Sequence, residues 1–397
     1  MNSVGNFFVK IYRTLRHWAA IAIKRIIYFS NPKKIMAATA SDKRTLYIDV
    51  TGTHFGDDKN GISRVVKKFC EVLKDSGVNH KLVYTKAFKG FLSCDDDSLI
   101  HFSPGDVYFC LYLTMDTVYN KRHLTIMQEN GVKIYFMLYD LIPLHYPSFY
   151  NHGFVRMFRK YVNDMLAYTG IITDSKAIID ELRQYVEINS IKNVNPDLIL
   201  EHVWLGSDFC YKKDIESLAQ NKVPEFLMVS TVEPRKKYDQ ALEAFELLWE
   251  KGVDVNLRIV GRPGWKNLKI FKTLSKHPEL NKRLFWYKSG ISDDELSGLY
   301  ENCDAVIFAS LEEGYGLAVV EAASYRKPVI LRDISVFREI AGDTAYYFSG
   351  LGGKDLADAV ENFIECKNAG NVKLPSVKSN SWKEFTNKIL ALIWDEK

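Results

Sequence analysis

The sequence predicts an α/β protein built from two Rossmann-like domains that face a central cleft. Two stretches far apart in the chain, 45–74 and 305–330, each combine a short apolar strand, a glycine-bearing loop and a helix. This unit is typical of open, parallel α/β sheets that bind ligands at the carboxyl ends of their strands. A polar segment at 187–224 separates the two halves and predicts the boundary between the domains.

Length and composition agree with two domains. A chain of 397 residues with 47% apolar content can bury a core in each of them. We expect an N-terminal segment at 1–40, a first domain at 41–215, a second at 216–375 and a terminal helix at 376–397. The six cysteines are scattered without a C-x-x-C pair or a cysteine and histidine cluster, which predicts neither disulfides nor a structural zinc site and fits a reducing compartment.

The positive charge is concentrated at the start of the chain. Seven lysines and arginines precede Asp42, the first acidic residue, so the net charge of +4 leaves −3 for the remainder. Because the globular part is mildly acidic, nucleic acid is not expected as a partner.

Residues 5–30 interleave aromatic and aliphatic side chains with basic ones at roughly helical spacing. The longest uncharged stretch, 17–23, is far shorter than a spanning helix requires, and no cleavage site of a secretory signal follows. The pattern predicts a basic amphipathic helix on an anionic membrane surface. A helix packed on the body of the protein, or a disordered basic leader, remains an alternative.

The first domain opens with a strand at 45–50, a polar loop with several glycines and a helix at 62–74. Gly61 lets the loop approach a ligand closely, and Arg64 at the start of the helix can reach an anion. The alternative for Arg64 is an ordinary surface position.

Further strands are expected at 107–113 and 132–138, the second followed by an irregular loop with Asp140 at its start. The carboxyl end of a parallel strand is where such sheets bind ligands, so Asp140 is a candidate site residue. Ser175 follows the strand-like segment GIITDS and precedes a helix, where it either belongs to the site or caps the helix.

The second domain begins with a strand at 225–230 and the loop TVEPRKK. Arg235 and Lys236 stand at the start of an amphipathic helix, where cations are electrostatically unfavourable unless an anion lies between them and the helix. A glycine loop that begins at Gly261 follows the strand at 256–260. We expect Arg235 and Lys236 to bind phosphate.

The stretch at 305–330 carries the strongest signal. Gly314, Tyr315, Gly316 and Leu317 lie at the N-terminus of a helix, where free N–H groups and the helix dipole favour phosphate. Glu313 and Glu321 frame this anion site with two carboxylates, which can accept hydrogen bonds from sugar hydroxyls. Asp95–Asp97 form the one D-x-D match and read as a solvated loop, so no metal site is expected.

EEGYGLAVVEA resembles the E-x7-E element of the family 4 retaining glycosyltransferases, which have the two-domain GT-B fold. The resemblance implies that Glu313 meets the transferred sugar and Glu321 the ribose, while the amides of Tyr315 to Leu317 meet the diphosphate. The loop EPRKK resembles the family loop E-P-R-K-N, which implies diphosphate contacts for Lys236, with Arg235 beside it.

The weaker matches assign roles to the remaining candidates. They imply that the loop of Gly261 lines the nucleotide pocket, and that Gly61, Arg64 and Ser175 border the sugar and the acceptor. The family often has His-Asp where this chain has Tyr139 and Asp140. Whether Tyr139 or His145 replaces that histidine stays open. The terminal helix at 382–393 is expected to cross back to the first domain.

The resemblance implies a catalytic role for Glu313 and Asp140 in metal-independent transfer of a hexose from a nucleotide diphosphate sugar, with retention at the anomeric carbon. The strings HDLIPL and EPRKN occur in mannosyltransferases of bacterial surface polysaccharides. They indicate GDP-mannose as donor, a glycan or lipid-linked acceptor in O-antigen or capsule synthesis, and a peripheral place on the cytoplasmic face of the membrane. Rhamnose, glucose, galactose or N-acetylhexosamine carried by UDP, dTDP or GDP, an epimerase, and a non-catalytic scaffold are the alternatives.

Overall fold

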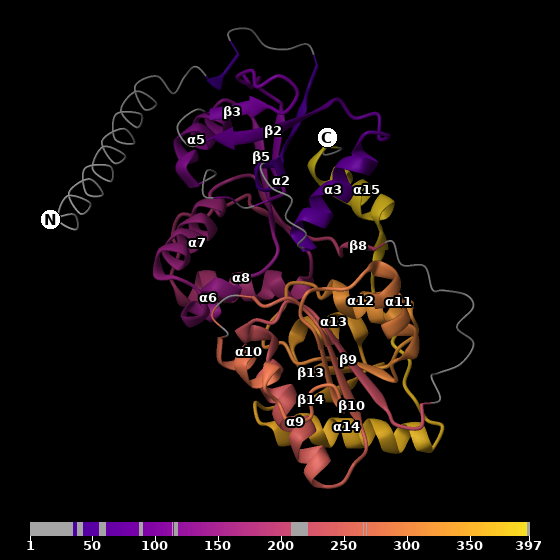
Figure 1. The fold of residues 1–397 in the computed structure, drawn as a ribbon. Helices are drawn as coiled ribbons and strands as arrows, with labels where there is room; N and C mark the ends of the chain where they lie inside the picture. Colours follow the sequence, from indigo (N-terminus) through magenta and orange to yellow (C-terminus); the bar gives the residue numbers. More distant parts are fainter. Residues whose placement is uncertain are drawn as a thin grey trace, which may run out of the picture.

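A computed structural model describes residues 35–37, 43–54, 61–86, 90–112, 114, 118–207, 221–264, 266 and 268–394. The basic segment at 5–30 lies outside these residues. The described chain forms two α/β bodies, one above the other in Figure 1, with the site between them. Each body has its own parallel sheet, as the sequence predicts.

The first body is built on a seven-stranded sheet with the order β3-β2-β1-β4-β5-β6-β7. All neighbouring strands are parallel except β2 and β3, which run antiparallel. β1, β4 and β6 are buried at every position, in keeping with their apolar, β-branched and aromatic residues. The strands are β1 (Leu46–Asp49), β2 (His80–Lys86), β3 (Gly90–Ser93), β4 (Val107–Cys110), β5 (Lys133–Leu138), β6 (Gly170–Thr173) and β7 (Ile199–His202).

Helices cover this sheet and follow its strands in sequence. The loop expected to be irregular after β1 contains one short helix, because the Asp49 carboxylate accepts hydrogen bonds from the backbone and hydroxyl of Thr51 and holds the turn. The helices are α2 (Thr51–His54), α3 (Gly61–Leu73), α5 (Lys121–Glu129), α6 (Ile142–His145), the 3₁₀ helix η2 (Pro147–Phe149), α7 (His152–Met165) and α8 (Lys176–Ile188).

The second body is built on a six-stranded parallel sheet with the order β11-β10-β9-β12-β13-β14. The strands are β9 (Glu225–Val229), β10 (Asn256–Val260), β11 (Leu284–Tyr287), β12 (Ala305–Phe308), β13 (Val329–Arg332) and β14 (Tyr346–Phe348). Its helical segments are η3 (Pro234–Lys236), α9 (Tyr238–Glu250), α10 (Leu268–Ser275), α11 (Asp293–Asn302), α12 (Leu317–Ser324), α13 (Ser335–Ala341) and α14 (Gly353–Asn368).

The chain order of the strands reverses between β1 and β4 in the first sheet and between β9 and β12 in the second. Loops at such a reversal diverge to opposite faces and leave a crevice at the carboxyl ends of the strands. The loop after β12 carries Glu313, and the loop after β9 carries Arg235 and Lys236. The topology therefore brings the two strongest motifs of the sequence to the same place.

The last helix, α15 (Trp382–Ile393), lies against α3 of the first body, as Figure 1 shows. Phe385 packs edge to face on Phe69 with ring centroids 6.2 Å apart. Arg44 donates a hydrogen bond of 2.7 Å to the carbonyl of Trp394. A two-stranded ladder of β8 (Gly206–Ser207) and β15 (Asn380–Ser381) precedes the helix. The end of the chain thus ties the two bodies together.

Candidate active site

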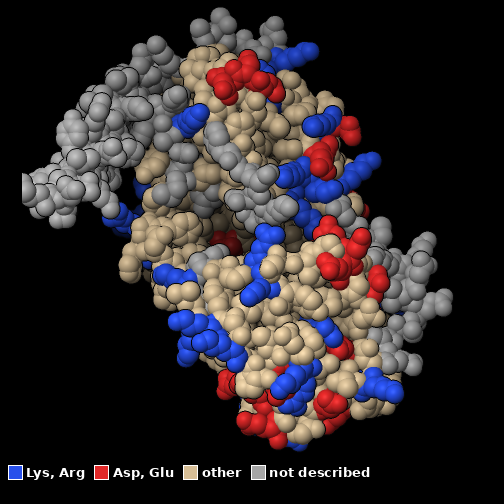
Figure 2. All heavy atoms as spheres, viewed as in Figure 1, with Lys and Arg blue, Asp and Glu red and all other residues tan. Residues whose placement is uncertain are grey.

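A cleft of about 890 Å³ lies between the two bodies. Figure 2 shows it as a hollow with acidic surface inside it and basic side chains at its edge. Eleven of the candidate residues line it: Gly61, Arg64, Asp140, Arg235, Lys236, Glu313, Gly314, Tyr315, Gly316, Leu317 and Glu321. Ser175 and Gly261 lie in the layer behind this lining.

The Glu313 carboxylate is held by the two cations of the basic loop. Arg235 Nη1 donates to Oε2 of Glu313 at 2.9 Å, and Lys236 Nζ donates to the other oxygen. Arg235 also bonds Glu233, with 2.5 Å from its Nε to Oε1, and its carbonyl accepts from the backbone N–H of Leu311 at 2.9 Å. The loops after β9 and β12 are therefore one hydrogen-bonded unit.

This arrangement fixes the charge of Glu313. Burial alone would raise the pKa of its carboxyl, but the charges of Arg235 and Lys236 outweigh burial and lower the pKa to about 2. Burial and the neighbouring Arg235 in turn lower the pKa of Lys236. The site therefore presents a carboxylate that is ionised throughout the physiological range, next to two cations that can serve an anionic ligand.

The turn into α12 depends on two glycines. Gly316 has φ of 89°, in the left-handed region that favours glycine, and forms the N-cap of the helix. A Cβ on Gly314 would lie 1.9 Å from the carbonyl oxygen of Tyr139, so this position admits no side chain. The backbone can therefore pass close to the opposite body and expose the first amides of α12 to the cleft.

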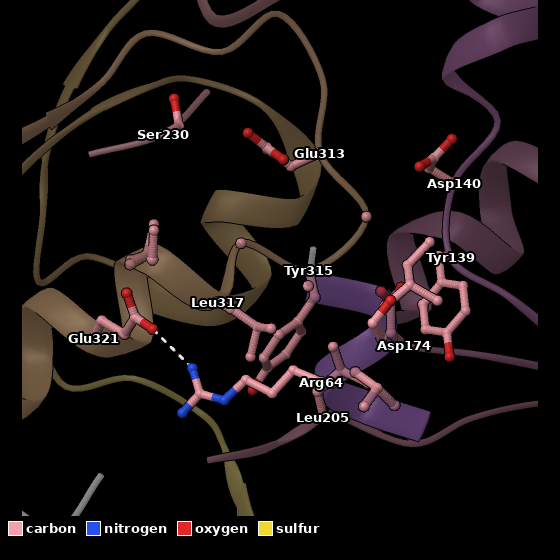
Figure 3. Close-up of a pocket in the computed structure, with 18 of the residues that line it drawn as sticks. Arg64, Tyr139, Asp140, Asp174, Leu205, Ser230, Glu313, Tyr315, Leu317 and Glu321 are labelled. Atoms are coloured by element: carbon pink, nitrogen blue, oxygen red, sulfur yellow. Dashed lines mark hydrogen bonds and ion pairs between the residues drawn. The ribbon is translucent and has the colours of Figure 1, made fainter. Parts of the chain in front are cut away.

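Arg64 and Glu321 form an ion pair across the cleft. Arg64 Nη1, on α3 of the first body, lies 3.0 Å from Glu321 Oε1, on α12 of the second, as the dashed line in Figure 3 marks. Burial raises the pKa of the Glu321 carboxyl, and Arg64 acts in the opposite direction. The carboxylate expected to meet a ribose thus has a partner from the other body.

Asp140 comes from the loop after β5 and lies across the cleft from Glu313 (Figure 3). Its Oδ1 accepts from the backbone N–H of Ile142 at 3.1 Å, which fixes the turn. Burial raises the pKa of Asp140 to about 6; Arg235 opposes the rise and Glu312 adds to it. This carboxyl therefore changes its charge near neutral pH, whereas Glu313 does not.

Neither Tyr139 nor His145 projects into the cleft as an isolated ring. The hydroxyl of Tyr139, a buried residue, donates to the carbonyl of Leu111 at 3.0 Å. His145 Nδ1 lies 2.9 and 3.0 Å from the two carboxylate oxygens of Glu312. Both rings are thus engaged away from the position between Asp140 and Glu313.

Ser175 performs both of the tasks considered for it. Its hydroxyl accepts from the backbone N–H of Ile178 as the N-cap of α8, and it donates to the carbonyl of Gly314 at 2.8 Å. Gly261 has no room for a side chain, because a Cβ there would lie 1.9 Å from the carbonyl oxygen of Ser230. These two residues shape the walls behind the site.

Four acidic residues in or near the cleft were not singled out from the sequence. Asp174 is buried, follows β6 and lies beside Gly314, while Glu339 on α13 accepts bonds from the backbone of Lys176 and Ala177 and from the indole of Trp204. Glu181 and Glu312 approach His145. The position of Asp174 at the end of a strand could have been read as that of Asp140 was. The others depend on contacts between the bodies, which sequence spacing does not reveal.

Comparison with known proteins places this site in a family. Residues 212–376 match the family described as Glycosyl transferases group 1. The chain is 33% identical over 389 residues to the serotype-specific mannosyltransferase WbdA of Escherichia coli, covering 88% of this chain and 47% of WbdA. It is 27% identical over 162 residues to the O-antigen chain mannosyltransferase B of Escherichia coli, covering 40% of this chain and 38% of that protein.

The fold is also found among solved structures. HepE of Anabaena, crystallised in complex with UDP, has a TM-score of 0.57 at 14% identity, covering 89% of this chain and 96% of that one. The chain spans about half the length of the WbdA proteins it matches. These matches confirm the resemblance to GT-B glycosyltransferases and to mannosyltransferases of surface polysaccharides. The chain therefore carries a domain of the glycosyl transferases group 1 family within a two-domain GT-B fold.

Proposed function

We propose that this protein is a retaining glycosyltransferase that moves mannose from GDP-mannose to a hydroxyl of a glycan or lipid-linked acceptor in bacterial O-antigen or capsule synthesis. The observation that carries the proposal is the ionised Glu313 held by Arg235 and Lys236 beside the N-terminus of α12. The relatives named mannosyltransferases support the sugar, over about half of their own length.

The donor would lie along the second body. Its diphosphate would meet Arg235, Lys236 and the first amides of α12, its ribose Glu321, and its sugar the Glu313 carboxylate. These cations and amides offset the negative charge that develops on the leaving diphosphate as the bond to the anomeric carbon breaks. Since they supply that charge, transfer requires no divalent ion at the diphosphate and no other cofactor.

The reaction exchanges one bond at the anomeric carbon for another on the same face of the sugar. The bond from that carbon to the diphosphate oxygen breaks as the bond to the acceptor oxygen forms, and the leaving phosphate oxygen takes the proton of the acceptor hydroxyl. Glu313 positions the sugar, and ionised Asp140 accepts a hydrogen bond from a sugar or acceptor hydroxyl on the opposite wall. Gly61, Arg64 and Ser175 border the acceptor side.

The acceptor fits a peripheral enzyme on the cytoplasmic face of the membrane. Among the described residues, no helix has the length and apolar character needed to cross a membrane. The basic amphipathic segment at 5–30 would hold the protein on anionic lipid. Deleting residues 1–40 should release the protein from anionic liposomes, and unchanged binding would contradict this part of the proposal.

Thermal unfolding of the purified protein with a panel of nucleotides and nucleotide sugars, with and without EDTA, tests the donor. A ligand that binds only the folded state raises its stability by mass action. We expect a selective shift with GDP and GDP-mannose that EDTA leaves unchanged. A shift with UDP or dTDP species instead would move the substrate to another hexose, and no shift with any of them would favour a non-catalytic scaffold. Product analysis with donor alone separates an epimerase.

A further inference from the structure

A cluster of one histidine and two glutamates joins the two bodies outside the cleft. His145 ends α6 and Glu181 lies on α8, both in the first body, while Glu312 belongs to the loop between β12 and α12 of the second. None of the three lines the cleft between the bodies. Glu312 directly precedes Glu313, so the cluster touches the loop that carries the proposed sugar-binding carboxylate.

The ligand atoms of these side chains converge. His145 Nδ1 lies 2.9 Å from Oε1 of Glu312 and 4.0 Å from Oε2 of Glu181. One nitrogen and one oxygen from each glutamate all lie within 4.8 Å of one another. Ligands at about 2.1 Å around a tetrahedral zinc ion stand about 3.4 Å apart. Small side-chain movements would therefore bring all three atoms onto one ion.

The surroundings of the cluster favour a cation. The Glu312 side chain is only 10% exposed, and Oε2 of Glu181 is shielded from solvent with no hydrogen-bond partner in the part of the chain that the structure describes. Two carboxylates that face each other with a single histidine repel when both are ionised. A dication would bind both and satisfy the shielded oxygen. The His145 side chain is 35% exposed, so an ion can reach the site from solvent.

We propose that His145, Glu181 and Glu312 form a binding site for a divalent transition-metal ion that ties the loop of Glu313 to the first body. One imidazole and two carboxylates suit zinc best, with manganese as the weaker alternative. The ion stabilises the arrangement in which the two bodies meet. It does not touch the donor, whose diphosphate charge falls to Arg235 and Lys236, so the site is separate from the proposed transfer reaction.

The same contacts can exist without a metal, as an ion pair of protonated His145 with Glu312 beside a protonated Glu181. Metal binding itself is therefore the property to measure. The full chain, treated with EDTA and dialysed, is titrated with zinc chloride and then with manganese chloride by calorimetry. We expect one equivalent of zinc with micromolar or tighter affinity, together with a higher midpoint of thermal unfolding.

Two variants each remove one ligand. His145→Ala and Glu181→Gln should each weaken zinc binding at least 10-fold, whereas His152→Ala, a change at an exposed histidine of α7, should leave it unchanged. Cobalt provides a second measurement, because a tetrahedral Co²⁺ site gives strong visible absorption. We expect this spectrum in the parent protein and its loss in both ligand variants. Circular dichroism verifies that each variant is folded.

Zinc binding below one equivalent, or binding and cobalt spectra that both ligand variants share with the parent, would overturn the proposal and leave an ion-paired cluster only. This failure is distinguishable from failure of the transferase proposal. The nucleotide-sugar panel is run in EDTA and responds to the donor site, while the metal titration is run without nucleotide.

Discussion

Arg64 on α3 and Glu321 on α12 form an ion pair of 3.0 Å that links the two bodies across the cleft. The pair joins the carboxylate expected to meet the donor ribose to the loop expected to border the acceptor. Because Arg64 uses one carboxylate oxygen of Glu321, a ribose hydroxyl at the same carboxylate has to share or displace this contact. Donor binding and the relative position of the two bodies are therefore coupled at this residue pair.

Breaking this pair should loosen the two bodies at a small cost in stability. The side chains are 34% and 20% exposed, so solvent screens the pair and its coupling energy should be below about 1 kcal/mol. A double-mutant cycle of Arg64→Met and Glu321→Gln, followed by denaturant unfolding, measures that energy. Lys251 and Glu361, an ion pair at the surface of the second body, provide a matched control. A coupling of several kcal/mol would contradict this account of the pair.

Replacing Glu313 by Gln should abolish most turnover while the fold persists. The amide keeps the shape of the side chain but removes the charge that positions the sugar and balances Arg235 and Lys236, so we expect a loss of about 10²- to 10³-fold in kcat. Steady-state transfer assays check the rate, and circular dichroism checks the fold. Glu361→Gln is the matched control on the surface of α14, and turnover near that of the parent in Glu313→Gln would refute the role.

The pH dependence of transfer should reflect Asp140 and not Glu313. Burial raises the pKa of Asp140 to about 6, so the carboxyl is protonated below this pH and ionised above it. We expect activity to fall on the acidic side with an apparent pKa near 6. The Asp140→Asn variant should be less active at pH 7.5 and should lack this limb. A limb of the same midpoint in that variant would assign it to another group.

The same pKa predicts an effect on stability with a definite sign. Since the folded pKa of Asp140 lies above its ordinary value of 3.8, ionisation of this carboxyl opposes folding. The Asp140→Asn variant should therefore gain unfolding free energy relative to the parent above about pH 6, and this gain should vanish below about pH 4. Denaturant unfolding at the two pH values compares them, and a gain that grows toward acid would contradict the argument.

Glu339 should be important for holding the bodies together. Its carboxylate accepts from the backbone N–H groups of Lys176 and Ala177 at 2.9 and 2.8 Å and from the Trp204 indole at 2.7 Å. Glu339→Ala removes the acceptor of these three donors and should cost about 1–3 kcal/mol of unfolding free energy. Small-angle scattering should show a larger radius of gyration than for Glu361→Ala. Equal radii would show that the contact does not restrain the bodies.

Much of this architecture could be predicted because it depends on local signals. The apolar runs at β1, β9 and β12 are the buried strands they indicate, and the Ser292 and Glu295 capping box marks the start of α11. Gly316 is needed at its position because the chain turns there with positive φ. The two motifs then meet because parallel strands place their carboxyl ends at one edge.

Other features could not be predicted because they arise where the two bodies meet. The contacts of Glu339 with α8 and of His145 with Glu312 join residues more than 160 positions apart, and no spacing rule relates them. The raised pKa of Asp140 likewise depends on its burial and on charges from the second body. A glutamate on a helix gives no sign in the sequence of the surface that it will face.

The anomeric configuration of the transfer product tests the central claim most directly. The protein is incubated with an oligomannose acceptor and with GDP-mannose, whose mannose is α-linked, in the presence of EDTA, and the new linkage is read by proton and carbon NMR. We predict an α-linked product from the parent protein and almost none from Glu313→Gln. A β-linked product, or equal product from both proteins, would contradict the account.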